Sequence, residues 1–301
     1  VAQLRSLGHR ANGMLVVTGP TGNGKSTTLK AILKDIRDSF PEKAIYSIED
    51  PVEDQLDGIT SLEVTKHMSF AKALRSLLRH DPDVIMVGEI RDAETAELAL
   101  RASMTGHLVL TTLHTNDSHG AINRLRNLGL DNALMAENLM AVTAQRLVNK
   151  VCPHCSSMLP ITQSKELWAK YQHVPELKNP ETLVPVVSNK EGCQYCNFGY
   201  TGRHLVCELF LNDPLSEKEI IEGISSNEIR YQQSQRGVFS DLWDDGIRLV
   251  KEGVTTLEAL ETRINPIGVA RAYRKADYGK PVSRAYSKVK AEDTLLDIEQ
   301  A

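Results

Sequence analysis

Short apolar runs alternate with amphipathic stretches over the first half of the chain, from Met14 to about Leu147. The apolar runs, rich in β-branched residues, predict strands at Met14–Thr18, Ala44–Ile48, Ile59–Val64, Val84–Val87 and Leu108–Thr112. Helical spacing predicts helices at Lys25–Phe40, Ser69–Arg79, Ala93–Met104, Asp117–Leu128 and Asn132–Val148, with Ser69 and Asp117 as N-caps. Strands that alternate with helices predict an α/β fold with a mainly parallel sheet covered on both faces. Such a sheet binds ligands beyond the carboxyl ends of its strands.

The second half of the chain differs from the first in composition and in the spacing of its apolar residues. Cysteines, prolines and polar residues dominate 151–204, which predicts an insertion stapled by a metal ion. Helical spacing returns over 205–265, with Leu242, Ile247, Leu249 and Val250 as core positions and Thr255 or Thr256 as the cap of the last helix. The remaining stretch, 266–301, is polar and basic in patches, which predicts a solvated tail. We therefore divide the chain into a nucleotide-binding core (1–150), a metal-binding subdomain (151–204), a C-terminal helical part (205–265) and the tail.

Composition excludes several classes of protein. The 301 residues suffice for one large or two modest domains, and the net charge of −4 gives no overall basic field for nucleic acid. No apolar run approaches the roughly 20 residues of a membrane span, and the first ten residues do not form a signal peptide. The five cysteines are too few for a disulfide scaffold.

A phosphate-binding loop follows the first predicted strand. Its residues are Gly19, Pro20, Thr21, Gly22, Asn23, Gly24, Lys25, Ser26 and Thr27, which fit the pattern Gly-x-x-x-x-Gly-Lys-Ser between a strand and a helix. The glycines allow consecutive backbone N–H groups to point at phosphate oxygens, and the helix start adds partial positive charge. Lys25 can reach the β- and γ-phosphates, and the Ser26 hydroxyl can hold Mg²⁺.

Two acidic stretches follow later predicted strands. Glu49, Asp50, Glu53 and Asp54 follow the second strand, where they could polarise water or hold Mg²⁺, or form an exposed acidic turn. Glu89 follows Val84–Val87 after a single glycine, and it could organise Mg²⁺ or cap the helix that starts at Ala93.

Two histidines flank the fifth predicted strand. His107 precedes it, and a structural role is the simpler interpretation there. His114 follows it on the phosphate side, where a neutral imidazole could orient the γ-phosphate.

Two Cys-x-x-Cys pairs lie in the insertion, Cys152 with Cys155 and Cys193 with Cys196. Each pair can give two thiolates to one tetrahedral Zn²⁺. Redox chemistry is the alternative, but two pairs favour zinc. Cys207 is interpreted as a small core residue.

Taken in order, these motifs resemble those of secretion ATPases of the type II secretion and type IV pilus assembly class. In that family the phosphate loop reads GPTGSGKST, and an acidic, a magnesium and a histidine box follow it. This chain has GPTGNGKST at 19–27, IEDPVE at 48–53, DPDVIMVGEIRD at 81–92 and GHLVLTTLHTN at 106–116, with Asn23 in place of the usual Ser. The segment GCQYCNFGYTGR at 192–203 resembles the family's second cysteine motif. The resemblance covers about residues 11–265 and implies a RecA-like P-loop NTPase core with a zinc-binding four-cysteine insertion.

The resemblance also implies roles for individual residues. Glu49 matches the glutamate that activates the attacking water, Glu89 the magnesium-box glutamate, and His114 the second histidine of the histidine box. Arg75 and Arg79 match arginines near the nucleotide or the subunit boundary. ATP, Mg²⁺ and Zn²⁺ are the implied cofactors.

The implied function is an ATP-hydrolysing motor for type IV pilus assembly or type II secretion. Such a motor forms a hexameric ring at the cytoplasmic face of the inner membrane and acts on a platform protein there. An upstream N-terminal domain is expected to pack over the nucleotide. Retraction-type pilus motors generally lack the four-cysteine subdomain, so its presence points to assembly or export. A nucleic-acid-translocating ATPase of the conjugation type is the alternative, and the acidic net charge argues against it.

Overall fold

The computed structural model describes residues 2–187, 189 and 191–264. These residues fall within one compact unit. The predicted tail, 266–301, lies outside the described residues.

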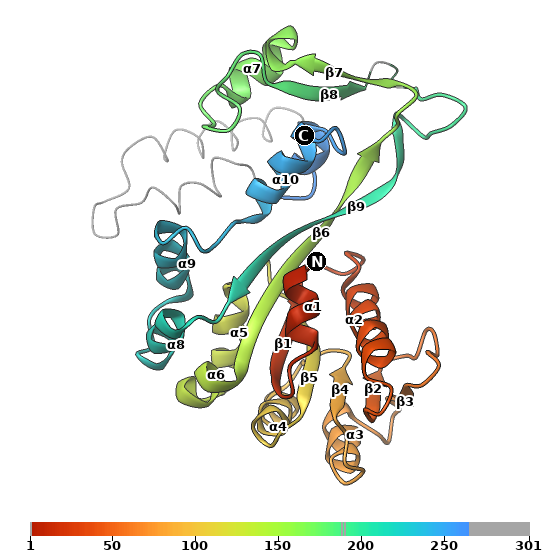
Figure 1. Cartoon of the computed structure of the whole chain (residues 1–301), viewed down its shortest axis with the longest axis vertical. Coiled ribbons are helices and arrows are strands. Elements are labelled where there is room, and N and C mark those ends of the chain that lie inside the picture. Colours follow the sequence, from red (N-terminus) through yellow and green to blue (C-terminus); the bar gives the residue numbers. More distant parts are fainter. Residues whose placement is uncertain (1, 188, 190, 265–301) are drawn as a thin grey trace, which may run out of the picture. The chain divides into compact units, whose positions relative to one another are not determined.

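A seven-stranded sheet forms the centre of the fold, in the order β3-β2-β4-β5-β1-β6-β9 (Figure 1). Neighbouring strands are parallel from β3 to β6, and β9 is antiparallel to β6. This confirms the predicted α/β class with a mainly parallel sheet. The strands are β1 (Gly13–Thr18), β2 (Ile45–Glu49), β3 (Thr60–Glu63), β4 (Val84–Val87), β5 (Leu108–Leu113), β6 (Leu139–Val151) and β9 (Tyr200–Leu211).

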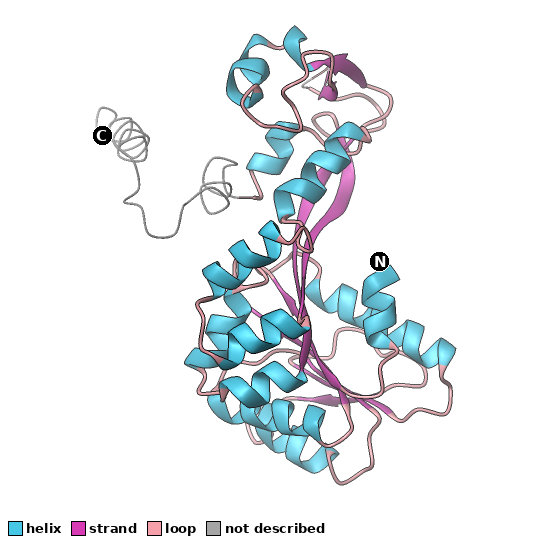
Figure 2. Cartoon of the chain, turned by 60° about the vertical axis from the view of Figure 1, so that its left-hand side comes forward, coloured by secondary structure: helices cyan, strands magenta, loops and turns pink. Residues whose placement is uncertain are grey.

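Helices cover both faces of the sheet (Figure 2). Alternate residues of β1 point to opposite faces, so Leu15 and Val17 belong to one apolar cluster and Met14 and Val16 to the other. The first cluster packs under α1 (Ala2–Gly8) and α2 (Lys25–Ser39). The second packs under α3 (Phe70–Leu77), α4 (Ala93–Met104), α5 (Gly120–Asn127), α6 (Asn132–Asn138), α8 (Pro214–Ile221) and α9 (Ser226–Gln235).

Side-chain caps set the starts of most of these helices. Ser69 accepts a hydrogen bond from the backbone N–H of Lys72 at the start of α3, as the sequence predicts, and Asp92 caps α4 in the same way. The helix α2 differs, because Gly24 stands at its N-cap and provides no side-chain cap. The backbone donors of its first turn are therefore not satisfied by a capping side chain.

The prediction of a helix over Asn132–Val148 is wrong. Helix α6 ends at Asn138, and the strand β6 begins at Leu139. Residues 139–146 are all buried, because β6 lies between β1 and β9 with both of its faces covered. A strand that is buried on both faces has no alternation of polar and apolar residues, so its sequence resembles that of a buried helix.

Two smaller predictions also need correction. The residues from Leu205 to Leu211 form the end of β9 rather than the start of a helical part. Helix α5 begins at Gly120 rather than at Asp117, although Asp117 Oδ1 accepts a hydrogen bond from the Gly120 backbone N–H at 2.7 Å. Both strands β6 and β9 run across the predicted domain boundaries, at residues 150 and 204.

The segment between β6 and β9 contains a second, two-stranded sheet. Strands β7 (Ser156–Pro160) and β8 (Leu183–Val187) pair antiparallel, and a short 3₁₀ helix (Ile161–Gln163) and α7 (Lys165–Tyr171) lie between them in sequence.

The end of the described chain is helical, as predicted. It comprises α8, α9, α10 (Leu242–Lys251) and α11 (Leu257–Glu261). Thr256 caps α11, and the four core residues predicted in α10 are buried.

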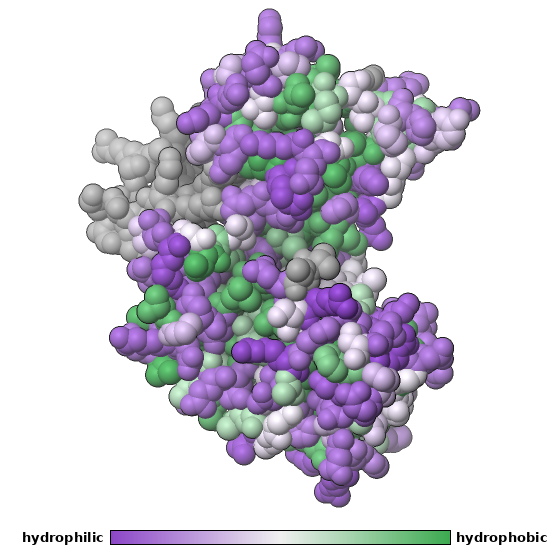
Figure 3. All heavy atoms as spheres, viewed as in Figure 1, coloured by the Kyte–Doolittle hydropathy of each residue, from purple (hydrophilic) through white to green (hydrophobic). Residues whose placement is uncertain are grey.

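The described helices do not include one that is long and apolar enough to cross a membrane. In the space-filling view, the visible surface around α2 is largely hydrophilic (Figure 3).

Candidate functional site

A pocket of about 600 Å³ lies at the carboxyl ends of the parallel strands. Its polar lining comes mainly from four regions that are far apart in the sequence: the phosphate loop and the start of α2, the acidic stretch after β2, the residues after β4, and the residue after β5. Glu49 is the last residue of β2, and His114 is the first after β5. Parallel strands end at the same edge of a sheet, which is why these polar groups meet.

The phosphate loop takes its shape from glycines and from contacts with β6. Gly19 has φ 143° and Gly24 φ 78°, and an ideal Cβ on Gly19 would lie 2.6 Å from the carbonyl oxygen of Gln145. The Gln145 amide donates to the Asn23 carbonyl at 2.7 Å, and Asn23 Oδ1 accepts from the backbone N–H of Leu147 at 2.9 Å. The adjacent strand therefore braces the loop, and Gly22 and Gly24 line the pocket.

Lys25 is a nearly buried cation in this loop. Its Nζ donates to the carbonyl oxygens of Gly19 at 2.9 Å and Pro20 at 3.2 Å. Burial lowers the pKa of Lys25, Glu89 opposes that shift, and Arg146 adds to it. A desolvated ammonium beside uncapped helix N–H groups suits a polyphosphate anion.

Glu49 is a buried carboxylate that two neighbours orient. Ser47 donates from its hydroxyl to Oε1 at 2.9 Å, and Lys30 Nζ lies 3.3 Å from Oε2. Only 7% of Glu49 is exposed, so the pocket is its route to solvent or ligand. The exposed acidic turn that the sequence left open does not describe this residue.

Glu89 lies in a small cluster of charged groups. His114 Nε2 is 3.4 Å from Glu89 Oε2, and Arg91 forms an ion pair with Glu89 and lies 3.6 Å from Asp50. Asp92 and not Glu89 caps α4, so the alternative role of Glu89 as a helix cap is wrong. Glu89 and Asp50 place carboxylate oxygens, the ligands that Mg²⁺ prefers, at this edge of the sheet.

The other predicted residues lie apart from the pocket. Arg75 pairs with the exposed Glu94 on α4, and neither Arg75 nor Arg79 is among the pocket-lining residues of the described chain. The structural interpretation of His107 agrees with its Nδ1, which lies 2.9 Å from the carbonyl oxygen of Ala102.

Several residues in or beside the pocket have no role in the expectations from the sequence. Arg203 of β9 lines the pocket, and its Nη1 lies 3.5 Å from the carbonyl oxygen of Gly22. Gln145, Lys30 and Arg91 also contribute, as described above. The pattern Gly-x-x-x-x-Gly-Lys-Ser predicts the loop. Its partners from β6 and β9 depend on strands that the sequence does not predict, because the residues of β6 have the pattern of a helix and the first residues of β9 resemble a part of the insertion.

The four cysteines of the two pairs form one cluster. The Sγ atoms of Cys152, Cys155, Cys193 and Cys196 all lie within 4.8 Å of one another. Three Sγ–Sγ distances are 3.8, 3.5 and 3.6 Å. Four sulfurs about 2.3 Å from a tetrahedral Zn²⁺ are about 3.8 Å apart, so the cluster fits that ion.

The cluster contains free thiols, and one of them is acidic. All five cysteines, Cys207 included, are outside disulfides. The backbone N–H of Cys193 donates to Cys196 Sγ at 3.2 Å and lowers the pKa of Cys196 to about 7. A thiol of this kind readily releases its proton to solvent when its sulfur binds a metal ion.

The family described as "Type II/IV secretion system protein" matches residues 1–262. The chain is 43% identical over 257 residues to the "Type II secretion system ATPase E" of Vibrio cholerae, a match that covers 84% of this chain and 49% of that protein. It is 38% identical over 269 residues to the "Type IV pilus assembly ATPase TfpB" of Acinetobacter baylyi, covering 88% of this chain and 44% of that protein. The chain thus spans about half the length of the curated relatives it matches.

Solved structures show the same fold. A crystal structure of the pilus retraction motor PilT with bound ADP matches with a TM-score of 0.65 and 30% identity, over 87% of this chain and 64% of that chain. The Legionella pneumophila ATPase DotB matches with a TM-score of 0.64 and 22% identity, over 87% of this chain and 62% of that chain.

Proposed function

The chain belongs to the type II/IV secretion system protein family, and on this premise we propose that its pocket binds Mg–ATP and hydrolyses it to ADP and phosphate. The observation that carries the proposal is the convergence of Lys25, Glu49, Glu89 and His114 on one pocket beside the uncapped start of α2. ATPases among the relatives, and ADP in the PilT structure, support the choice of nucleotide.

Each polar group has a distinct task in this proposal. The phosphate loop and Lys25 hold the β- and γ-phosphates, and the Ser26 hydroxyl together with Glu89 holds Mg²⁺ and its waters. Mg²⁺, when bound, neutralises the charge that develops on the phosphate oxygens. Glu49, oriented by Ser47 and Lys30, accepts a proton from the attacking water. His114 orients the γ-phosphate from the side of Glu89.

We further propose that hydrolysis drives a motor. The full-length protein would form a hexameric ring at the cytoplasmic face of the inner membrane, where it would act on a platform protein of a type II secretion or type IV pilus assembly machine. Both machines appear in the names of relatives. The four cysteines would bind one Zn²⁺, which suits an assembly or export motor rather than a retraction motor.

The test compares matched glutamate variants. Steady-state phosphate release and ATP affinity are measured for the chain and for the full-length protein, each with Glu49→Gln, Glu89→Gln and, as a control, Glu97→Gln. Glu97 pairs with Arg101 on the exposed face of α4, outside the pocket. We expect Glu49→Gln to lose about 10²- to 10⁴-fold in turnover with affinity retained, because only the proton acceptor is removed.

Three results would contradict the proposal. Turnover that survives Glu49→Gln, or that falls equally with Glu97→Gln, would remove the catalytic assignment. Stimulation of turnover by DNA, with tight and salt-sensitive DNA binding, would favour the nucleic-acid motor instead.

A further inference from the structure

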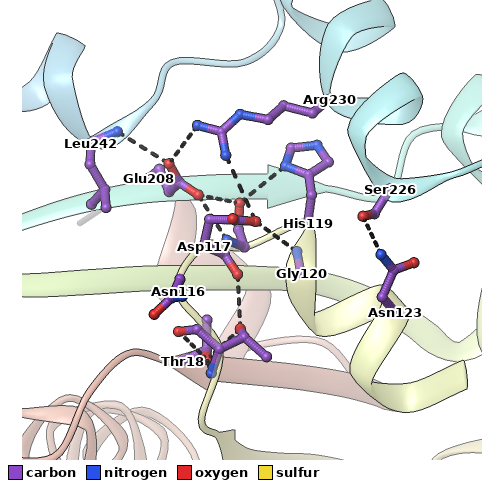
Figure 4. A network of polar contacts seen from close by, with 12 residues as sticks. Thr18, Asn116, Asp117, His119, Gly120, Asn123, Glu208, Ser226, Arg230 and Leu242 are labelled. Carbon is purple, nitrogen blue, oxygen red and sulfur yellow. Dashed lines mark hydrogen bonds and ion pairs between the residues drawn. The ribbon is translucent and has the colours of Figure 1, made fainter. Parts of the chain in front are cut away.

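Glu208 is a wholly buried carboxylate outside the pocket. It lies on β9, and its side chain has 0% exposure. The backbone N–H and the hydroxyl of Ser118 both donate to Oε1 at 2.8 Å. The backbone N–H of Leu242 donates to Oε2 at 3.2 Å, and Arg230 Nη2 lies 3.5 Å from the same oxygen. Figure 4 shows Arg230 and Leu242 converging on Glu208.

The position of this carboxylate is costly in free energy. Burial raises the pKa of Glu208, and the Arg230 guanidinium opposes that shift. A buried carboxylate that loses a donor retains its desolvation penalty, so the elements that supply the donors cannot move away from it independently. Apolar side chains of similar volume are often at least as stabilising as a buried ion pair. Stability alone therefore gives no reason for a charge here.

One partner of Glu208 lies in a loop that is also hydrogen-bonded to the residue before the phosphate loop. Ser118 lies in the loop that joins β5 to α5, and Thr115 lies in the same loop. The backbone N–H of Thr115 donates to Thr18 Oγ1 at 2.8 Å, and the two hydroxyls are 2.8 Å apart. Thr18 is the last residue of β1 and directly precedes Gly19. The loop that begins with His114 is thus hydrogen-bonded near one end to the residue that precedes the phosphate loop, and near its other end to Glu208.

The remaining partners of Glu208 belong to the C-terminal helices. Arg230 is on α9, and Leu242 is the first residue of α10. Arg230 Nη1 also lies 3.7 Å from Asp117 Oδ1, so α9 also contacts the loop after β5 directly. A displacement of the loop would therefore act on both helices through buried polar contacts.

We propose that Glu208 is a positioning residue that links the loop after β5 to α9 and α10, so that a nucleoside triphosphate bound at the phosphate loop shifts the start of α10. This inference rests on the proposed function, because it needs a nucleotide at that loop. It adds a route by which the C-terminal helices respond to the bound nucleotide. Such a route is established only by measured coupling, because spatial continuity alone does not show it.

The chain provides a matched control for this buried ion pair. Arg236 Nη1 lies 3.2 Å from Glu219 Oε1, and it also contacts Asp213, so this cluster joins α8 to the end of α9. Burial raises the pKa of Glu219 as it does for Glu208. Glu219→Gln thus removes a partly buried charge from the same helical region without touching a partner of the loop after β5.

A buried tryptophan in the first turn of α10 can report on changes around that helix start. Trp243 follows Leu242 in α10 and is 1% exposed, and the other of the two tryptophans is Trp168 in α7. A Trp168→Phe background leaves Trp243 as the single tryptophan. Its emission then reports on the environment of the first turn of α10.

The experiment measures nucleotide binding and helix response separately. In the Trp168→Phe background of the whole chain, calorimetry gives the affinity for Mg²⁺ with adenylyl imidodiphosphate, a non-hydrolysable ATP analogue. Trp243 emission is recorded over the same titration, and unfolding curves confirm that each variant is folded. We expect the emission of Trp243 to change during the titration, with the same midpoint as the calorimetric binding curve. We expect Glu208→Gln to lose at least about three-quarters of this change while affinity stays within about threefold, and Glu219→Gln to keep the change.

Each outcome decides the question. An emission change that survives Glu208→Gln, or that Glu219→Gln abolishes equally, overturns the proposal. If Glu208→Gln does not fold, Ser118→Ala replaces it, because that variant removes one donor and leaves the charge paired; an undiminished emission change in Ser118→Ala then overturns the proposal. Binding without any emission change in the parent chain overturns this inference alone. Absence of binding overturns the proposed function and this inference with it.

Discussion

Acid should destabilise this protein through a single buried histidine. His119 is 1% exposed, and its ring packs edge-on against Phe210 and Phe239, with centroids 5.0 and 4.6 Å away. Its Nε2 lies 3.1 Å from Gln233 Oε1. Burial lowers the pKa of His119 to about 3, Arg230 adds to that shift, and the Gln233 contact opposes it. An unfolded chain would hold this histidine near its ordinary pKa of about 6.5.

The sign of the effect follows from proton counting. Between the two pKa values the unfolded state binds more protons at His119 than the folded state does, so the free energy of unfolding falls as pH falls. The full difference of roughly 3.5 pH units corresponds to about 5 kcal/mol. From about pH 7.5 to about pH 5 the free energy of unfolding falls by about 2 kcal/mol. This fall is set mainly by the unfolded-state pKa, because the folded-state pKa lies well below pH 5.

The assay is urea unfolding at a series of pH values for the parent chain and for His119→Gln. The variant loses ring packing at every pH, so the informative quantity is the gap between the two curves. We expect the gap to narrow by about 2 kcal/mol from about pH 7.5 to about pH 5, because the variant has no group to protonate there. Protonation of the cysteine thiols affects both proteins and cancels. His67→Gln, at an exposed position, controls for the removal of a histidine. Parallel curves for the parent and His119→Gln would refute this reasoning.

Three further changes test the phosphate loop and the cysteine cluster. Gln145→Leu removes the amide that donates to the Asn23 carbonyl in the loop. We expect the ATP affinity, measured by calorimetry, to fall about fivefold, because one such hydrogen bond contributes about 1 kcal/mol. Unchanged affinity would show that this hydrogen bond is dispensable. Gly19→Ala places a methyl group 2.6 Å from the Gln145 carbonyl oxygen, at a φ of 143°. We therefore expect a lower unfolding midpoint and loss of ATP binding. A variant that is stable and binds ATP would contradict the loop geometry. Cys193→Ser should abolish the one Zn²⁺ per chain that metal analysis is expected to find, and Cys207→Ser should retain it; equal zinc in both would exclude the four-cysteine site.

The sequence predicted the parts of the fold that local patterns encode. Strands β1 to β5 and helices α2 to α4 follow from apolar runs and from caps such as Ser69, because each of these signals lies within a few residues of the element it sets. The phosphate loop was visible for the same reason. Its glycines and Lys25 must be adjacent in sequence to shape one anion site.

The sequence did not predict what depends on long-range pairing. Strand β6 has both faces covered, so its sequence shows no alternation of polar and apolar residues. The pattern over Leu139–Val148 therefore predicts a helix, although these residues form a strand. Strand β9 pairs with β6 across an insertion, and its first residues were assigned to that insertion. Gln145 on β6 and Arg203 on β9 reach the phosphate loop only once this pairing exists, so no local pattern predicts their contacts with that loop.

The pairing of β6 with β9 also links the cysteine cluster to the nucleotide pocket. The contact between β1 and β6 ends at Ala144, so the part of β6 beyond it is paired only with β9. A two-stranded ribbon is marginally stable by itself, and Cys152 directly follows this one. A metal held there would therefore stiffen the strand that positions Gln145.

Removal of the metal should consequently weaken nucleotide binding as well. We expect a chelator to lower ATP affinity by at most the roughly fivefold effect of Gln145→Leu, because the ribbon acts on the loop through that side chain. The same treatment of Gln145→Leu should then produce little additional loss. A chelator effect that is equally large in Gln145→Leu would mean that the cluster influences the pocket by another route.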